Sequence, residues 1–123
     1  MKILTFTLIF LFCSTFAFAQ TMSKELLTQK KWVLKSDEMS GIGTHNSLPG
    51  DTEIEFKVNG RWIATEGIEN LKEGIWVENK KGEIILKLRM KKKAKVVSLT
   101  ASELKILINY KTKARELVWE SKI

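Results

Sequence analysis

The chain has 123 residues with a single cysteine and a single histidine, and its formal net charge is +7. This length allows one domain, and one histidine excludes a metal site built from two histidines of the same chain. The excess of lysine and arginine either keeps an exported domain soluble or attracts an anionic partner. We therefore expect a single small domain with no metal and no other cofactor.

The first nineteen residues follow the pattern of a secretory signal peptide. Lys2 supplies one positive charge, residues 3–12 are mainly apolar, and Ala17 and Ala19 form a small-x-small cleavage site. The apolar run is shorter than the ~20 residues that a membrane-spanning helix needs. We predict cleavage after Ala19, which leaves residues 20–123 as one secreted or periplasmic domain without a transmembrane segment.

Cys13 raises the alternative of a lipoprotein, in which a cysteine is acylated after the leader is cleaved. The bacterial lipobox needs a small residue directly before this cysteine, and here that residue is Phe12. We therefore expect Cys13 to leave with the leader and expect no lipid anchor. The remaining domain then contains no cysteine, which excludes disulfides and thiolate metal sites.

Beyond the leader, one short helix and then a series of strands are predicted. Residues 23–30 form the helix, because Ser23 can cap it and Leu26 and Leu27 give it an apolar stripe. From Trp32 onward the apolar residues recur with a period of two, which is typical of strands. The predicted strands are residues 32–35, 53–58, 61–65, 74–78, 83–90, 95–99, 104–110 and 115–120.

Two of these strands and their connections carry specific expectations. Asn59-Gly60 predicts a type I′ hairpin turn, which needs positive φ at both central residues. Alternation places one apolar row on each of two strands, namely Ile54, Phe56 and Val58, and Ile84, Leu86, Leu88 and Met90. Residues 39–51 and 66–72 are the longer connections, which in a compact domain are usually functional or loose.

Eight short strands joined mostly by tight bends favour an all-β fold. We predict an eight-stranded antiparallel up-and-down barrel with a short N-terminal helix, because closure removes the two exposed edges of an open sheet. A β-sandwich is the alternative, but its Greek-key crossovers need longer connections than these bends provide.

The order of elements also resembles a known family. Leu27 to Trp32 form a Leu-x-x-x-x-Trp opening, Gly74-Ile75-Trp76 forms a Gly-x-Trp on a middle strand, and a long first loop follows the first strand. This arrangement is similar to that of the lipocalins, and more closely to small lipocalin-like domains exported by Bacteroidetes-type bacteria. The resemblance implies a small apolar ligand, and a structural cation–π contact of Arg115 over Trp32.

A ligand pocket, if present, is expected to be shallow and near the barrel mouth, beneath residues 39–51. An eight-stranded barrel is just wide enough to be filled by side chains, and the inward rows contain few small residues. The candidate ligand contacts are Trp62, Trp76 and Tyr110. The alternative for Trp62 and Trp76 is a packed cross-strand pair in the core.

Positive charge gathers on one bend of the chain. Its residues are Arg89, Lys91, Lys92 and Lys93, which could contact anionic lipid or an acidic glycan of the cell envelope. The alternative is a solvated hairpin tip, where like charges discourage aggregation. Nucleic acid is not an expected partner, because no aromatic residues interleave with these lysines.

The sequence thus supports two hypotheses of function. The first is a lipocalin-like binding module for a small apolar or amphipathic ligand at the barrel mouth. The second is a monomeric envelope interaction domain with a filled barrel, which binds a protein or an anionic surface through its basic rim. His45 is expected to be a solvated loop residue, and no set of residues indicates an enzyme.

Overall fold

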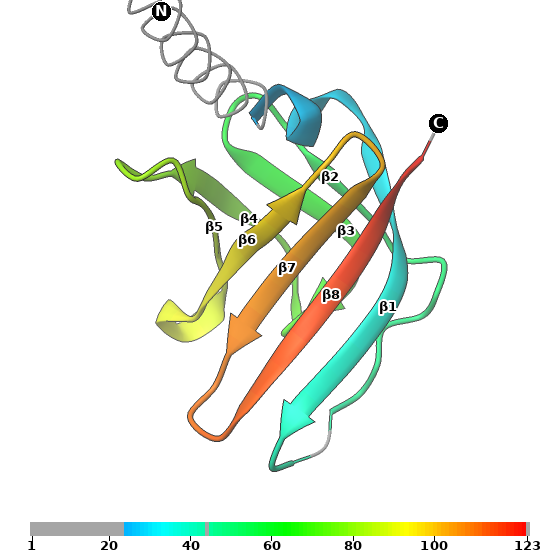
Figure 1. Ribbon diagram of the computed structural model, residues 1–123, viewed down its shortest axis with the longest axis vertical. Helices are drawn as coiled ribbons and strands as arrows, with labels where there is room; N and C mark the ends of the chain where they lie inside the picture. Colours follow the sequence, from blue (N-terminus) through cyan, green and yellow to red (C-terminus); the bar gives the residue numbers. More distant parts are fainter. Residues whose placement is uncertain (1–23, 44, 123) are drawn as a thin grey trace, which may run out of the picture.

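The computed structural model describes residues 24–43 and 45–122 of the chain (Figure 1). The predicted leader and its cleavage site lie outside the described residues. Residues 24–29 form a short helix, and no helix in the described part is long and apolar enough to cross a membrane. The strands are β1 (Lys31–Gly41), β2 (Glu53–Phe56), β3 (Arg61–Ile68), β4 (Leu71–Glu78), β5 (Ile84–Lys87), β6 (Lys93–Leu99), β7 (Glu103–Asn109) and β8 (Lys113–Lys122).

Each strand pairs antiparallel with the next along the chain, and β1 pairs antiparallel with β8. The sheet therefore closes into a barrel of eight strands, which confirms the all-β antiparallel barrel expected from the alternating pattern. Closure gives each of the eight strands two neighbours, although β1 pairs with β2 only over Lys31–Val33 and the β3–β4 ladder is interrupted between Ile63 and Ile68.

The barrel has two different ends. At the helix end, residues 24–29 lie near the turns at residues 57–60 and 100–102, while the turn at residues 79–83 projects away from the helix (Figure 1). The cavity end, so named for the pocket described below, carries the connections at residues 42–52, 69–70, 88–92 and 110–112. Leu27 of the short helix is fully buried, and its carbonyl accepts a hydrogen bond of 3.1 Å from Trp32 Nε1. The helix thereby covers one end of the core.

The interior of the barrel is filled with apolar side chains. Trp32, Trp62, Trp119 and Phe56 are its largest fully buried members. Gly74 makes room for one of these rings, because a Cβ at this position would lie 2.6 Å from Trp62 Nε1. The interior is thus a packed core along most of the barrel, which leaves room inside it for a ligand only near an end.

A β-bulge changes the direction of side chains along β1. Leu34 is opposite Trp119 on β8, but Lys35 has no partner and Ser36 is opposite Val118. The extra residue shifts the alternation, so that Asp37 comes opposite the inward-facing Leu117. Directly opposite residues share a face of the sheet, and the bulge therefore turns Asp37 toward the interior.

The turns differ in part from those expected. Asn59-Gly60 does not form a type I′ turn, because only Gly60 has a positive φ and its amide bonds to the Lys57 carbonyl at 3.0 Å. Strand β2 consequently ends at Phe56, and Val58 is 79% exposed instead of facing the core. The four-residue turn ends the alternation two residues earlier than the sequence pattern indicated.

Two hairpins at the cavity end have positive φ at both central residues. These residues are Glu69 and Asn70 between β3 and β4, and Met90 and Lys91 between β5 and β6. Residues 66–72 are therefore a tight hairpin and not a long connection. Met90 is 89% exposed, against the expectation that it extends the inward row, because β5 ends at Lys87 and the chain turns.

Candidate functional site

A cavity of about 450 Å³ opens at the cavity end of the barrel. It lies beneath the connection between β1 and β2, where the sequence placed a barrel-mouth pocket. Four connections and the strands β1, β3 and β8 contribute its lining: Met39, His45, Asn46, Ser47, Leu48, Gly67, Glu69, Asn70, Lys92, Tyr110, Lys113 and Arg115.

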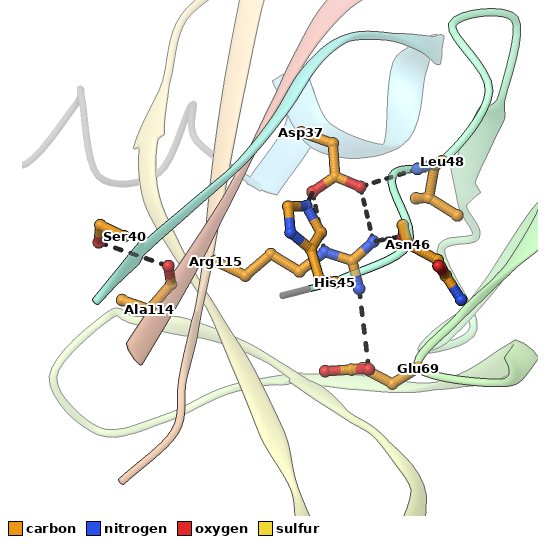
Figure 2. A network of polar contacts seen from close by, with 8 residues as sticks. All are labelled: Asp37, Ser40, His45, Asn46, Leu48, Glu69, Ala114 and Arg115. Carbon is orange, nitrogen blue, oxygen red and sulfur yellow. Dashed lines mark hydrogen bonds and ion pairs between the residues drawn. The ribbon is translucent and has the colours of Figure 1, made fainter. Parts of the chain in front are cut away.

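A buried ion pair lies at the wall of this cavity. Arg115 Nε and Nη2 donate hydrogen bonds of 2.8 and 2.6 Å to the two carboxylate oxygens of Asp37 (Figure 2). The side chains are only 5% and 2% exposed, respectively. Arg115 continues the inward row of Leu117 and Trp119 on β8, and the bulge in β1 supplies the carboxylate that a buried guanidinium needs.

The surroundings keep both members of this pair ionised. Burial alone would raise the pKa of Asp37, but hydrogen bonds from Arg115 and from the Leu48 amide, with the charge of Arg115, hold that pKa below its usual value. The hydrogen bond to Asp37 raises the pKa of Arg115 more than burial lowers it. The pair is therefore a fixed charge arrangement at neutral pH.

The same ion pair holds the first loop in place over the barrel. The Leu48 amide donates a hydrogen bond of 2.9 Å to Asp37 Oδ2, and the Asn46 carbonyl lies 3.4 Å from Arg115 Nη2 (Figure 2). His45 Nε2 lies 3.1 Å from Asp37 Oδ1. His45 is only 16% exposed in its side chain, so it is part of this network and not the solvated loop residue that was expected.

Glu69 approaches Arg115 from the opposite side of the cavity. Its Oε2 lies 3.7 Å from Arg115 Nη1, while its Oε1 is buried and has no hydrogen-bond partner among the described residues (Figure 2). Glu69 also has a left-handed backbone, with φ of 51°. Strained backbone and an unsatisfied buried oxygen occur together here, a combination found more often at functional sites than elsewhere.

Two ammonium groups flank the ring of Tyr110. Lys92 Nζ and Lys113 Nζ each lie 5.2 Å from the ring centroid, within the range of cation–π attraction. The ring thus lies between two lysines from different segments, one in the β5–β6 turn and one at the start of β8. The result is a cationic wall with an aromatic surface between its charges.

The charges of the cavity favour an anionic ligand. Three cationic side chains line it, and among the described lining residues Glu69 is the only carboxylate. Asp37 offsets the charge of Arg115, and the two lysines still outnumber Glu69, so the site keeps an excess of one positive charge. Met39, Leu48 and the Tyr110 ring add apolar surface beside these charges. This combination suits an amphipathic molecule with an acidic group.

The predicted ligand contacts are separated by the structure. Tyr110 lines the cavity, whereas Trp62 and Trp76 are buried in the core and do not line it. Trp76 Nε1 donates a hydrogen bond of 2.9 Å to the Lys57 carbonyl near the helix end. Trp76 packs edge-on against Phe56, with ring centroids 6.5 Å apart. Trp62 is directly opposite Gly74, so the two tryptophans are diagonal neighbours on β3 and β4.

The four basic candidates lie in the β5–β6 turn and at the start of β6. Lys92 reaches the cavity, while Arg89, Lys91 and Lys93 are exposed outside it.

The expected contact of Arg115 over Trp32 is absent. In the pairing of β1 with β8, Trp32 lies opposite Ser121, whereas Arg115 lies opposite Met39. Seven residues of strand separate these levels, roughly 23 Å along the barrel. The guanidinium binds Asp37 at the far end instead.

Sequence reasoning missed Asp37, His45 and Glu69 as members of the site. Asp37 was hidden because the bulge at Lys35 reverses the alternation that sequence patterns assume. One signal was available, since Arg115 shares the inward parity of Leu117 and Trp119 and a buried arginine needs a carboxylate. The pattern does not show which carboxylate meets it, because Asp37 is 78 residues away along the chain.

Residues 24–43 and 45–122 contain no group of three histidine, cysteine, aspartate or glutamate side chains that could hold a metal ion. Comparison of the chain with protein-family models, with curated proteins and with solved structures finds no significant match. The geometry of the cavity is therefore the basis for the functional proposal.

Proposed function

We propose that this protein is an exported, lipocalin-like binding module that takes a small amphipathic molecule with an acidic group into the cavity at its barrel mouth. The observation that carries the proposal is the cavity of about 450 Å³, walled by Lys92, Lys113 and Arg115 at the end of an otherwise filled barrel. The volume lies within the range of ~300–1,000 Å³ typical of small-molecule sites.

The position of the cavity supports the comparison with lipocalins. A barrel whose strands pair in chain order leaves one end covered by the short helix and the other end surrounded by loops. The longest of these loops is fixed over the cavity by Asp37 and Arg115. A fixed loop and a rigid barrel lower the ordering cost of binding, because the site does not have to be assembled by the ligand.

The preference for an acidic group follows from the cationic wall. A carboxylate near Lys92 and Lys113 would meet two ammonium groups, while the apolar part of the ligand would contact Tyr110 and Leu48. Arg115 keeps its hydrogen bonds to Asp37, which offset its charge, so Lys92 and Lys113 supply the attraction for the acidic group. A hydrogen bond to a charged group contributes about 1.5–3 kcal/mol.

We infer a non-catalytic role, without a cofactor. Asp37 is held ionised by Arg115, and a carboxylate with a lowered pKa is a weak general base near neutral pH. Export is inferred from the leader pattern of residues 1–19, which leaves a domain without cysteine in an oxidising compartment.

Calorimetric titration with three molecules of equal chain length tests the proposal. Decanoate, decanol and decyltrimethylammonium share a ten-carbon chain and carry an anionic, a neutral and a cationic head group, respectively, and each is used below its aggregation concentration. We expect saturable binding that is tightest for decanoate, by about tenfold or more over decanol. Equal affinity for all three, or no saturable binding of any, contradicts the proposal.

A pair of matched double variants then locates the site. Lys92→Gln with Lys113→Gln should weaken decanoate binding by about tenfold, because both ammonium groups of the wall are removed. Lys80→Gln with Lys81→Gln removes the same charge from the exposed β4–β5 turn at the helix end and should leave the affinity unchanged. Equal losses of decanoate affinity in both double variants would show that the net charge of the protein, and not the cavity, determines binding.

A further inference from the structure

The turns around the cavity carry a concentrated positive charge. The β5–β6 and β7–β8 turns, with the first residues of β6 and β8, carry six basic side chains and no acidic one: Arg89, Lys91, Lys92, Lys93, Lys111 and Lys113. No ion pair with another described residue is formed by four of these side chains, namely those of Arg89, Lys91, Lys93 and Lys111. These four charges are therefore available to an external partner.

Two apolar side chains project from the same end of the barrel. Met90 is 89% exposed and stands between Arg89 and Lys91, and Ile42 is 78% exposed just beyond the end of β1. Met90 has a φ of 56°, a conformation that side chains other than glycine and asparagine seldom adopt. The turn thus presents a large apolar side chain to solvent at a strained position.

The basic and apolar residues form one continuous rim. Lys92 and Lys113 meet at the Tyr110 ring and join the β5–β6 turn to the β7–β8 turn. The Ile42 amide bonds to the Thr112 carbonyl at 3.1 Å and joins the end of β1 to the same rim. Figure 1 shows these three segments at the end of the barrel away from the short helix.

We propose that this rim docks on an anionic lipid bilayer, with Met90 and Ile42 entering the interface and the surrounding lysines contacting lipid phosphates. The charges alone would suit any polyanion, but a polysaccharide offers no apolar phase for Met90 and Ile42. A bilayer interface accepts both kinds of side chain, since basic residues meet its anionic surface and apolar ones its acyl boundary. The docked protein directs its cavity toward the membrane.

This inference is independent of ligand binding in the cavity, and the two can fail separately. Docking uses Arg89, Met90, Lys91, Lys93 and Lys111 on the outside of the rim, which do not line the cavity. If both hold, a membrane-derived amphiphile could pass between bilayer and cavity without crossing water.

Vesicle sedimentation tests the electrostatic part of the proposal. The exported form of the protein is mixed with phosphatidylcholine vesicles that either contain or lack phosphatidylglycerol. Its N-terminal residue is first identified by mass spectrometry. Binding should need the anionic lipid, and Lys91→Glu with Lys93→Glu should weaken it by at least about tenfold. The matched control is Lys80→Glu with Lys81→Glu at the helix end, expected to lose far less. Equal losses from both double variants overturn a specific docking rim.

Substitution of the apolar tip tests the bilayer against other polyanions. Met90→Asn should weaken vesicle binding by roughly three- to tenfold while keeping retention on dextran sulfate unchanged. Asparagine adopts left-handed backbone readily, so this variant is expected to fold. Val58→Asn, at an exposed apolar residue of the helix end, is the matched control and should bind vesicles normally. Unchanged vesicle binding of Met90→Asn overturns the proposal in favour of a charge-only partner.

A fluorescent label measures insertion directly. Because residues 20–123 contain no cysteine, an introduced cysteine can be labelled alone with an environment-sensitive dye. A dye at Ile42→Cys should shift to shorter wavelength on anionic vesicles, and a dye at Val58→Cys should not. A shift at neither position or at both overturns the assigned orientation.

Discussion

The two ends of the barrel are built from different interactions. At the helix end, Leu27 and Trp32 complete an apolar core, and Gly60 and Gly82 occupy the positive-φ positions of the turns. At the cavity end, a buried ion pair replaces the apolar cover. The positive-φ positions of two hairpins there are filled by Glu69, Asn70, Met90 and Lys91. The helix end is thus built from apolar packing and unstrained turns, whereas the cavity end keeps strained turn residues and buried charges. Such retention is characteristic of functional sites.

Removal of Arg115 should give the largest loss of stability at the cavity end. Arg115→Met leaves the Asp37 carboxylate buried without its bidentate partner, and breaking a buried pair in this way costs about 3–5 kcal/mol. Denaturant unfolding measures the loss. The double variant with Asp37→Asn should recover part of it, because the uncompensated charge is removed.

A core truncation at the helix end makes a useful comparison with this variant. Leu27→Ala should also cost about 2–5 kcal/mol through lost packing. It should leave decanoate affinity unchanged, whereas Arg115→Met should reduce it. If Leu27→Ala weakens ligand binding as much as Arg115→Met, the two ends are not independent.

Acid should weaken the cavity end through Asp37. The folded state holds the pKa of Asp37 below its ordinary value of 3.8, so its contribution is complete above that value and is lost as the pH falls through the folded pKa. Unfolding free energy measured at decreasing pH should therefore fall less steeply below about pH 4 in Asp37→Asn than in the unmodified protein.

Glu83 offers the matching measurement at the helix end. Hydrogen bonds from Lys95 and Asn79 lower the pKa of Glu83, but this group lies at the surface, where solvent screens the interaction. Glu83→Gln should therefore change the acid slope much less than Asp37→Asn. A larger effect from Glu83→Gln would contradict the assignment of the acid-sensitive charge to the cavity end.

Turn substitutions should give the smallest effects, with opposite signs at the two ends. Lys91→Gly relieves a φ of 64°, which should outweigh the greater backbone freedom of glycine in the unfolded chain and stabilise the protein by about 0.5–1 kcal/mol. Gly82→Ala places a Cβ at a φ of 79° and should destabilise it by about 1 kcal/mol. Thermal unfolding measures both. A destabilising effect of Lys91→Gly would show that the strained turn is held by contacts of the lysine itself.

The architecture could be predicted from the sequence because it depends on local alternation. Rows such as Leu104, Ile106 and Ile108 repeat with a period of two, and short bends force neighbouring strands to pair. Errors occurred where a turn interrupts this period. Val58 and Met90 continue the apolar alternation in the sequence, but each lies in a turn and is exposed.

The site was less predictable because it depends on contacts between distant segments. Tyr110 and Lys92 were selected for their residue types, and the cavity was expected beneath the first loop. The ion pair of Asp37 and Arg115 depends on the bulge at Lys35 and on the register of β1 against β8. A local sequence pattern predicts neither the bulge nor the register, and a one-residue shift of either moves every following side chain to the other face of the sheet.

The seam between β1 and β8 has a consequence for the order of folding. These strands come from opposite ends of the barrel sequence, so the cylinder cannot be completed before the last strand is available. Pairings of such long sequence separation require an expensive chain closure and slow the folding reaction. A polypeptide emerging from the ribosome therefore stays incompletely folded until β8 has been made, however early β1 to β7 are available.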